Sequence, residues 1–167
     1  RDFIFIINKG QESNFRSSLG NQEDLGIKIK FITQDKPKGL PDAFIVAQKL
    51  IKNGPVAMIL GDNFFYGNML SPLIKKSFNH TNGCKIYLYP SNKPHSYGVV
   101  EFDKKNKIKK IIEKPKKTNS NSIITGLYVF DKKVSNFAKK LRPSKRNEIE
   151  IVDLINLYKK KNKLKVI

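Results

Sequence analysis

The chain has 167 residues, 39% of them hydrophobic, enough for one domain with an apolar core or for a large piece of a bigger domain. Its net charge of +19 is spread along the whole chain, which is typical of a general rise in surface charge rather than of a nucleic-acid-binding module. No apolar stretch reaches the ~18 residues of a membrane span, and a single cysteine excludes an internal disulfide and fits a reducing cytoplasm.

The first half of the chain alternates between strand and helix patterns. A continuous apolar run at residues 2–8 predicts a strand buried on both faces. Further strands are predicted at residues 27–32 and 56–60, and helices at residues 11–19, 40–51 and 70–80. Short links between alternating elements predict an α/β fold with a Rossmann-like, doubly wound, mixed and mainly parallel sheet.

The second half of the chain is rich in strand patterns. Strands are predicted at residues 84–89, 97–103, 107–113 and 122–130, and helices at residues 134–141 and 148–160. Cys84 lies in the first of these strands, so we interpret it as a packing residue and not as a nucleophile. We predict a single α/β domain over residues 1–167, whose boundary between halves falls at residues 83 and 84.

The segment Leu60-Gly61-Asp62-Asn63 follows the third predicted strand directly. In doubly wound sheets, ligands bind outside the carboxyl ends of the strands, so a carboxylate at position 62 could hold Mg²⁺. Asp and Asn are also common turn residues, and the local sequence leaves both interpretations of Asp62 open.

Three further features occur at strand ends or within strands. Glu113-Lys114-Pro115 places an acid beside a base, where they could bind a sugar hydroxyl and a phosphate. Gly98 and Gly126 each lie in a strand pattern, and each is compatible either with a ligand that approaches the backbone or with a β-bulge.

The order and spacing of these features resemble the sugar-nucleotide pyrophosphorylase (nucleotidyltransferase) family, and within it the thymidylyltransferases that act on glucose 1-phosphate. The resemblance runs in family order across nearly the whole chain. The matching blocks are Gln34-x-x-Pro37-x-Gly39-Leu40, Leu60 to Gly67, Tyr97 to Asp103, Glu113-Lys114-Pro115, Thr125 to Tyr128, and Glu148-Ile149-Glu150-Ile151 with Asp153.

The resemblance implies a role for each matching residue. Asp62 would be one of two aspartates that hold a catalytic Mg²⁺, and Lys114 would contact the phosphate of the sugar phosphate. Gln34 and Gly39 would face the nucleotide base. The remaining residues would line the sugar site: Leu60, Asn63, Tyr97, Gly98, Glu113, Ile124 and Tyr128. Residues 1–83 would then form a nucleotide and metal half, and residues 84–167 a sugar-binding half.

The resemblance also implies the reaction. An oxygen of glucose 1-phosphate would attack the α-phosphorus of dTTP, giving dTDP-glucose and releasing pyrophosphate. The expected setting is a cytoplasmic homo-oligomer, tetrameric in relatives, that binds no specific nucleic acid or membrane. Its product would feed deoxysugar synthesis, such as dTDP-rhamnose for surface polysaccharide.

Two residues depart from the family pattern, and two family segments are missing from the sequence. Ser96 stands where arginine is expected, and Asn147 stands where glycine is common. The family's glycine-rich opening should precede Arg1, and its second metal-binding aspartate should follow Ile167. We therefore expect this chain to be an internal piece that is inactive alone.

Two alternatives stay open. The first is a UTP- or CTP-using nucleotidyltransferase of the same fold, because the Gln34 amide can both donate and accept hydrogen bonds. The second is a basic nucleic-acid-binding domain, which only the charge favours.

Overall fold

The computed structural model describes residues 2–21, 24–51, 54–79 and 81–167. The strands are β1 (Asp2–Asn8), β2 (Lys28–Gln34), β3 (Val56–Ile59), β4 (Cys84–Pro90), β5 (Gly98–Phe102), β6 (Ile108–Glu113), β7 (Ser122–Phe130) and β8 (Leu164–Val166). The helices are α1 (Glu12–Leu19), α2 (Asp42–Val46), α3 (Leu70–Asn79), α4 (Val134–Ala138) and α5 (Ile151–Lys160), with a 3-10 turn at Pro94–Ser96. The strands and helices predicted from the sequence are therefore all present, with differences at their ends, and β8 is an additional strand. Residue 80, the last of the helix predicted at residues 70–80, lies outside the described residues.

The largest difference in length is at α2, because the helical pattern extended to residue 51 whereas the helix ends at Val46. Ala47, only 4% exposed, and the partly buried Ile51 still pack into the core from the turns that follow. The apolar spacing predicted burial at these positions correctly, but buried residues do not have to lie in a regular helix.

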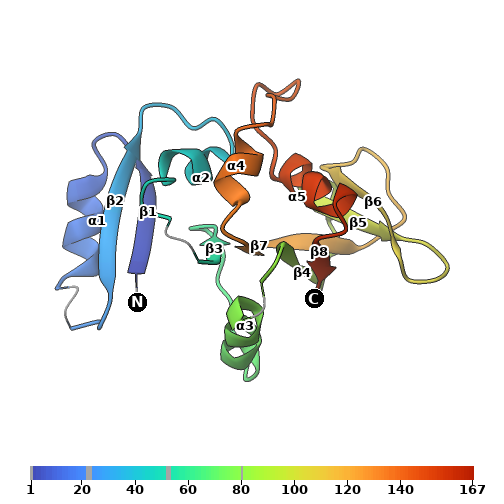
Figure 1. Cartoon of the computed structure of the whole chain (residues 1–167), viewed down its shortest axis with the longest axis horizontal. Coiled ribbons are helices and arrows are strands. Elements are labelled where there is room, and N and C mark those ends of the chain that lie inside the picture. Colours follow the sequence, from blue (N-terminus) through green and yellow to red (C-terminus); the bar gives the residue numbers. More distant parts are fainter. Residues whose placement is uncertain (1, 22–23, 52–53, 80) are drawn as a thin grey trace.

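The strands β1 and β2 pair in parallel as a two-stranded sheet at one end of the molecule, beside α1 (Figure 1). The prediction that β1 is buried on both faces is wrong for this structure: Phe3 is 42% exposed, and Ile7 is the buried residue of the strand. The reason is that, among the described residues, β1 pairs with β2 alone, while Phe5 packs on Phe15 and Phe31.

The other strands form a mixed sheet in the order β6-β5-β7-β4-β8, to which β3 adds by pairing with β7. The α/β class with a mixed sheet is confirmed. The share of parallel pairs is lower than expected, because within the described residues only β1–β2 and β4–β8 are parallel. The long strand β7 is the centre of this sheet, with β3, β4 and β5 all antiparallel to it.

Alternate residues of the central strands face two separate cores. Ile86, Tyr128 and Phe130 pack with residues of α2, α4 and α5 in the main core. Leu127 and Val129 pack on the opposite face, where Leu73 and Ile74 belong to α3. This is the period-2 alternation of a strand that is covered on both sides.

The helix α5 shows why the sequence folds in this way. Its buried residues recur at helical spacing and form one apolar face. They are Ile151, Val152, Leu154, Ile155 and Tyr158. Asp153 in the first turn and Lys159 and Lys160 in the last turn suit the helix dipole. No helix in the described part of the chain is long and apolar enough to cross a membrane.

Candidate functional site

The turn after β3 is attached to the central strand β7. The N–H of Leu60 donates to the carbonyl of Gly126 over 3.0 Å, and the side-chain Oδ1 of Asn63 accepts from the N–H of Gly126 over 3.1 Å. The Asn63 Nδ2 donates to Oδ1 of Asp62 over 2.8 Å. Asn63 therefore links the exposed Asp62 carboxylate to the backbone of β7.

Gly126 lies in a β-bulge, which is one of the two interpretations that its sequence allowed. Ile86 pairs with Tyr128 and Leu88 pairs with Ile124, so residues 125–127 oppose one residue of β4 in a bulge. A Cβ atom at Gly126 would lie 2.6 Å from the Asn63 side chain, so only glycine leaves room for this side chain. The group that approaches the backbone is thus Asn63 itself.

A second group of predicted residues gathers where β5, β6 and β7 meet. Gly98 pairs with Glu113 across β5 and β6. A Cβ atom at Gly98 would lie 3.2 Å from the Ile124 side chain and 3.5 Å from Oε2 of Glu113. The buried Tyr128 belongs to the same core cluster as Ile124. Burial and then the Glu113 charge raise the pKa of its phenol. The structure therefore brings these four predicted sugar-site residues together.

Lys114 is held in an unusual backbone conformation beside this group. Its φ is +41°, a left-handed region that costs an L-residue roughly 1–2 kcal/mol. Its N–H donates to the carbonyl of Tyr97 over 3.0 Å, which fixes the turn after β6 to the start of β5. Strained backbone of this kind is concentrated at functional sites, and the role of Lys114 stays a prediction.

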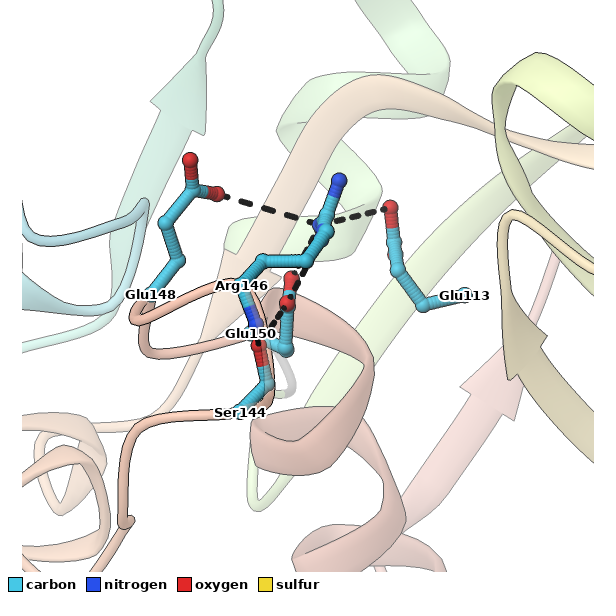
Figure 2. Close-up of polar contacts among 5 residues, drawn as sticks. All are labelled: Glu113, Ser144, Arg146, Glu148 and Glu150. Atoms are coloured by element: carbon cyan, nitrogen blue, oxygen red, sulfur yellow. Dashed lines mark hydrogen bonds and ion pairs between the residues drawn. The ribbon is translucent and has the colours of Figure 1, made fainter.

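Arg146 connects four acidic and polar side chains (Figure 2). They are Glu113 at the end of β6, and Ser144, Glu148 and Glu150 in the segment that precedes α5. Its guanidinium donates to both oxygens of Glu150, over 3.0 and 2.6 Å, and lies 3.7 Å from Oε1 of Glu113. Glu148 is 3.8 Å away, and the Ser144 hydroxyl donates to Glu150 over 2.6 Å. Arg146 and Ser144 are not among the residues predicted from the sequence. The available signal was that Arg146 is one of four arginines in a lysine-rich chain and precedes Glu150 by four residues.

The pKa values of the two carboxylates beside Arg146, those of Glu113 and Glu150, are shifted in opposite directions. Burial raises the pKa of Glu113, with a further rise from Glu150 that Arg146 and Lys114 oppose. Burial acts to raise the pKa of Glu150 as well, but hydrogen bonds from Arg146 and Ser144 outweigh it, and this pKa is lowered. Glu113 is the carboxylate whose charge is less well compensated, and a ligand hydroxyl that donates to it would compensate it further.

The predicted nucleotide-side residues lie on the first half of the chain. Gln34 ends β2, and its Nε2 donates to Oδ2 of the buried Asp42 over 2.9 Å. Gly39 has a φ of +102°, and a Cβ atom there would overlap the backbone of Ile149. The N–H of Ile149 donates to the carbonyl of Lys38 over 2.7 Å. The segment that carries Arg146 and Glu150 thus touches both the Gly39 loop and Glu113.

Asn147 explains one departure from the family pattern. Its φ is +59°, a conformation that glycine and asparagine adopt more readily than other residues. Asparagine can therefore replace the common glycine without a change in the backbone. The structure offers no account of Ser96 beyond its place in the 3-10 turn before Tyr97.

Asp62 is the residue that the sequence predicts as a metal ligand. Within the described residues, no three His, Cys, Asp or Glu side chains converge to hold a metal ion. Asp62 is nevertheless suited to a hard cation, because its carboxylate is exposed and oriented by Asn63. Mg²⁺ is often held by one or two carboxylates together with substrate phosphates.

The chain is similar to known proteins along its whole length. The family model for nucleotidyl transferases matches residues 1–167. Glucose-1-phosphate thymidylyltransferases from Neisseria meningitidis and Neisseria gonorrhoeae are 37% and 39% identical over 166 residues, 99% of this chain. The chain spans 58% of the length of each of these relatives.

Solved structures give the same result. A Bacillus anthracis protein described as a candidate glucose-1-phosphate thymidylyltransferase, in complex with a sucrose, superimposes with a TM-score of 0.87 at 32% identity, covering 98% of this chain and 66% of that one. A UDP-glucose pyrophosphorylase with UDP-glucose shares the fold, with a TM-score of 0.74 at 20% identity over 97% of this chain and 69% of that one. From the match of the family model to every residue, the chain belongs to the nucleotidyl transferase family.

Proposed function

We propose that the protein containing this chain transfers a thymidylyl group from dTTP to glucose 1-phosphate, forming dTDP-glucose and pyrophosphate. The observation that carries the proposal is the segment from Arg146 to Glu150, which touches the Gly39 loop on one side and Glu113 on the other. This contact joins the residues expected to bind the nucleotide to those expected to bind the sugar. Similarity to glucose-1-phosphate thymidylyltransferases supports the choice of substrates.

The proposed chemistry requires positioning and charge neutralisation rather than a protein nucleophile. A phosphate oxygen of glucose 1-phosphate forms a bond to the α-phosphorus of dTTP, and the bond from that phosphorus to the oxygen bridging to the β-phosphorus breaks. Pyrophosphate leaves with the electron pair. Lys114 would hold the sugar phosphate, and Glu113 would accept hydrogen bonds from sugar hydroxyls beside Gly98, Ile124 and Tyr128.

Asp62 is proposed as a ligand of Mg²⁺, which would neutralise phosphate charge when bound. The support is its exposure, its place after β3 and its hydrogen bond from Asn63. Because no three His, Cys, Asp or Glu side chains converge to hold a metal ion among the described residues and the chain spans 58% of its relatives, we also propose that residues 1–167 alone do not catalyse the reaction.

The test is pyrophosphate release by the full-length gene product with dTTP and glucose 1-phosphate. Asp62→Asn should abolish Mg²⁺-dependent release, because the amide oxygen carries no charge for the cation. Asp24→Asn is the matched control, since Asp24 is an exposed aspartate in the turn before β2. No release by the wild type, or an active Asp62→Asn variant, would contradict the proposal.

Two further expectations stay predictions. A cytoplasmic location is supported by Cys84, a single cysteine that is buried as a free thiol. Assembly into a homo-oligomer follows from the resemblance alone and can be measured by light scattering.

A further inference from the structure

The hydrogen bond between Gln34 and Asp42 joins the end of β2 to the first residue of α2. The Asp42 residue is 8% exposed, and Gln34 is half-buried. The 2.9 Å separation between Nε2 of Gln34 and Oδ2 of Asp42 is that of a well-formed hydrogen bond.

This bond fixes which end of the Gln34 amide points to Asp42. An ionised carboxylate has only acceptor atoms, so the group that faces it must be the amide NH₂. Rotating the amide by 180° would place its oxygen against the carboxylate oxygen, and two acceptors in a half-buried site would each be left without a donor. Gln34 therefore keeps its carbonyl oxygen and its second N–H for another partner.

Pyrimidine bases differ in the hydrogen-bonding groups that they present to the remaining carbonyl oxygen and N–H of the Gln34 amide. Thymine and uracil carry an imide edge, with N3–H as donor and a neighbouring carbonyl as acceptor. Cytosine carries N3 as acceptor and a neighbouring amino group as donor. The Gln34 amide can pair with either edge, but the cytosine edge needs the amide in its rotated state.

We propose that Asp42 is a specificity-determining positioning residue, which holds the Gln34 amide so that the site selects an imide base, thymine or uracil, over cytosine. The inference rests on the proposed function, in which Gln34 faces the base of the nucleotide. A CTP-using enzyme is disfavoured, because the cytosine edge needs the rotated amide. Thymine and uracil present the same edge, so Asp42 does not separate these two.

The experiment compares dTTP, dUTP and dCTP as substrates of the full-length gene product and of its Asp42→Asn variant. Asparagine can donate as well as accept, so the rotated Gln34 amide becomes tolerable. The ratio of kcat/KM for dTTP to that for dCTP should fall about tenfold or more, because a site built to hydrogen-bond one edge rejects the other strongly. The ratio of dTTP to dUTP should stay unchanged.

A purely structural role for Asp42 would lower the rates with all three nucleotides together and leave both ratios unchanged, and this result would overturn the inference. Gln34→Ala gives a second, independent variant, in which the preference over dCTP should also collapse. In the double variant Asp42→Asn with Gln34→Ala, the ratio should match that of Gln34→Ala alone, since Asp42 acts through Gln34.

Nucleotide binding separates failure of this inference from failure of the proposed function. Calorimetry with dTDP and dCDP should show the same fall in preference in Asp42→Asn, even if the sugar acceptor is not glucose 1-phosphate. An unchanged binding preference would overturn the inference while wild-type turnover of dTTP upholds the function. A wild type that binds neither nucleotide would overturn both.

Discussion

The side chain of Asn63 accepts a hydrogen bond from the backbone N–H of Gly126, 3.1 Å away and 63 residues later in the chain. Its amide nitrogen donates to Asp62 over 2.8 Å. Because both ends of this amide are used within the protein, Asn63 orients the proposed metal ligand. Gly126 is required for that geometry, since it lacks the Cβ atom that would displace Asn63.

The first prediction concerns Gly126→Ala. The new methyl group would lie 2.6 Å from Asn63, and we expect a loss of about 1–3 kcal/mol in the free energy of unfolding, typical of overpacking. Thermal and denaturant unfolding measure this loss. Gly54→Ala is the matched control, since nothing lies within 4 Å of its Cβ position, and it should change stability by less than about 0.5 kcal/mol. Equal effects of the two variants would contradict the role given to Gly126.

The second prediction compares two Arg–Glu pairs of the same spacing. Arg146–Glu150 and Arg16–Glu12 both have N–O separations of 2.6 Å, but the Glu150 side chain is 10% exposed and that of Glu12 is 43% exposed. Arg16→Met should cost about 0.3–0.5 kcal/mol. Arg146→Met should cost roughly 1–2 kcal/mol, since it leaves a buried carboxylate without its cation while solvent still screens the site. Urea titrations of both variants measure the difference, and similar costs would show that burial of Glu150 is unimportant.

The third prediction concerns Glu113 and pH. Its pKa is raised above the ordinary value of 4.5, chiefly by burial, so the folded state binds this proton more tightly than the unfolded state. Glu113 therefore disfavours folding once it ionises, and its contribution to stability declines as pH rises from about 4.5 through the raised pKa. In Glu113→Gln this titration is absent.

The measurement is the free energy of unfolding of wild type minus that of Glu113→Gln, determined across this pH range. The difference should decrease with rising pH and then become constant. A difference that increases with pH would show that the pKa of Glu113 is lowered by Arg146 instead.

The fourth prediction separates backbone strain from charge at Lys114. Glycine adopts a φ of +41° without steric cost, whereas alanine, like lysine, has a Cβ atom and keeps that cost. Lys114→Gly should therefore be more stable than Lys114→Ala by about 1 kcal/mol, while both variants lose turnover in the full-length gene product. Asn106→Gly is the control at a φ of +56° in the turn before β6, and it should keep wild-type turnover. If Lys114→Gly stays active, the ammonium group is not needed.

The fifth prediction concerns the free thiol. Burial, and then the Asp131 charge, raise the pKa of Cys84 well above its ordinary value, and the residue is 1% exposed. A thiol reagent should leave the native chain unmodified at neutral pH and react after unfolding in urea. Rapid labelling of the native chain would contradict the interpretation of Cys84 as a packing residue.

The sequence by itself determined the elements and their order, apart from the short strand β8, because hydrophobic periodicity and turn residues are local signals. It also placed the candidate residues at strand ends, and identified the family from blocks spread along the chain. It misjudged β1, because burial of both faces depends on which strands lie beside it. The helix at Asp42–Val46 was overextended for a similar reason, since core packing can continue in turns.

Only the tertiary structure decided which residues meet. Asn63 contacts the backbone of Gly126, and Arg146 lies beside Glu113, although the members of each pair are far apart in the sequence. Even the pair of Gln34 and Asp42, eight residues apart, depends on how α2 folds back against the end of β2. Such contacts arise from chain packing and leave no periodic signal in the sequence. For this reason the residue types indicated the chemistry of the site. The orientation of the Gln34 amide and the charge balance around Arg146 came from the fold.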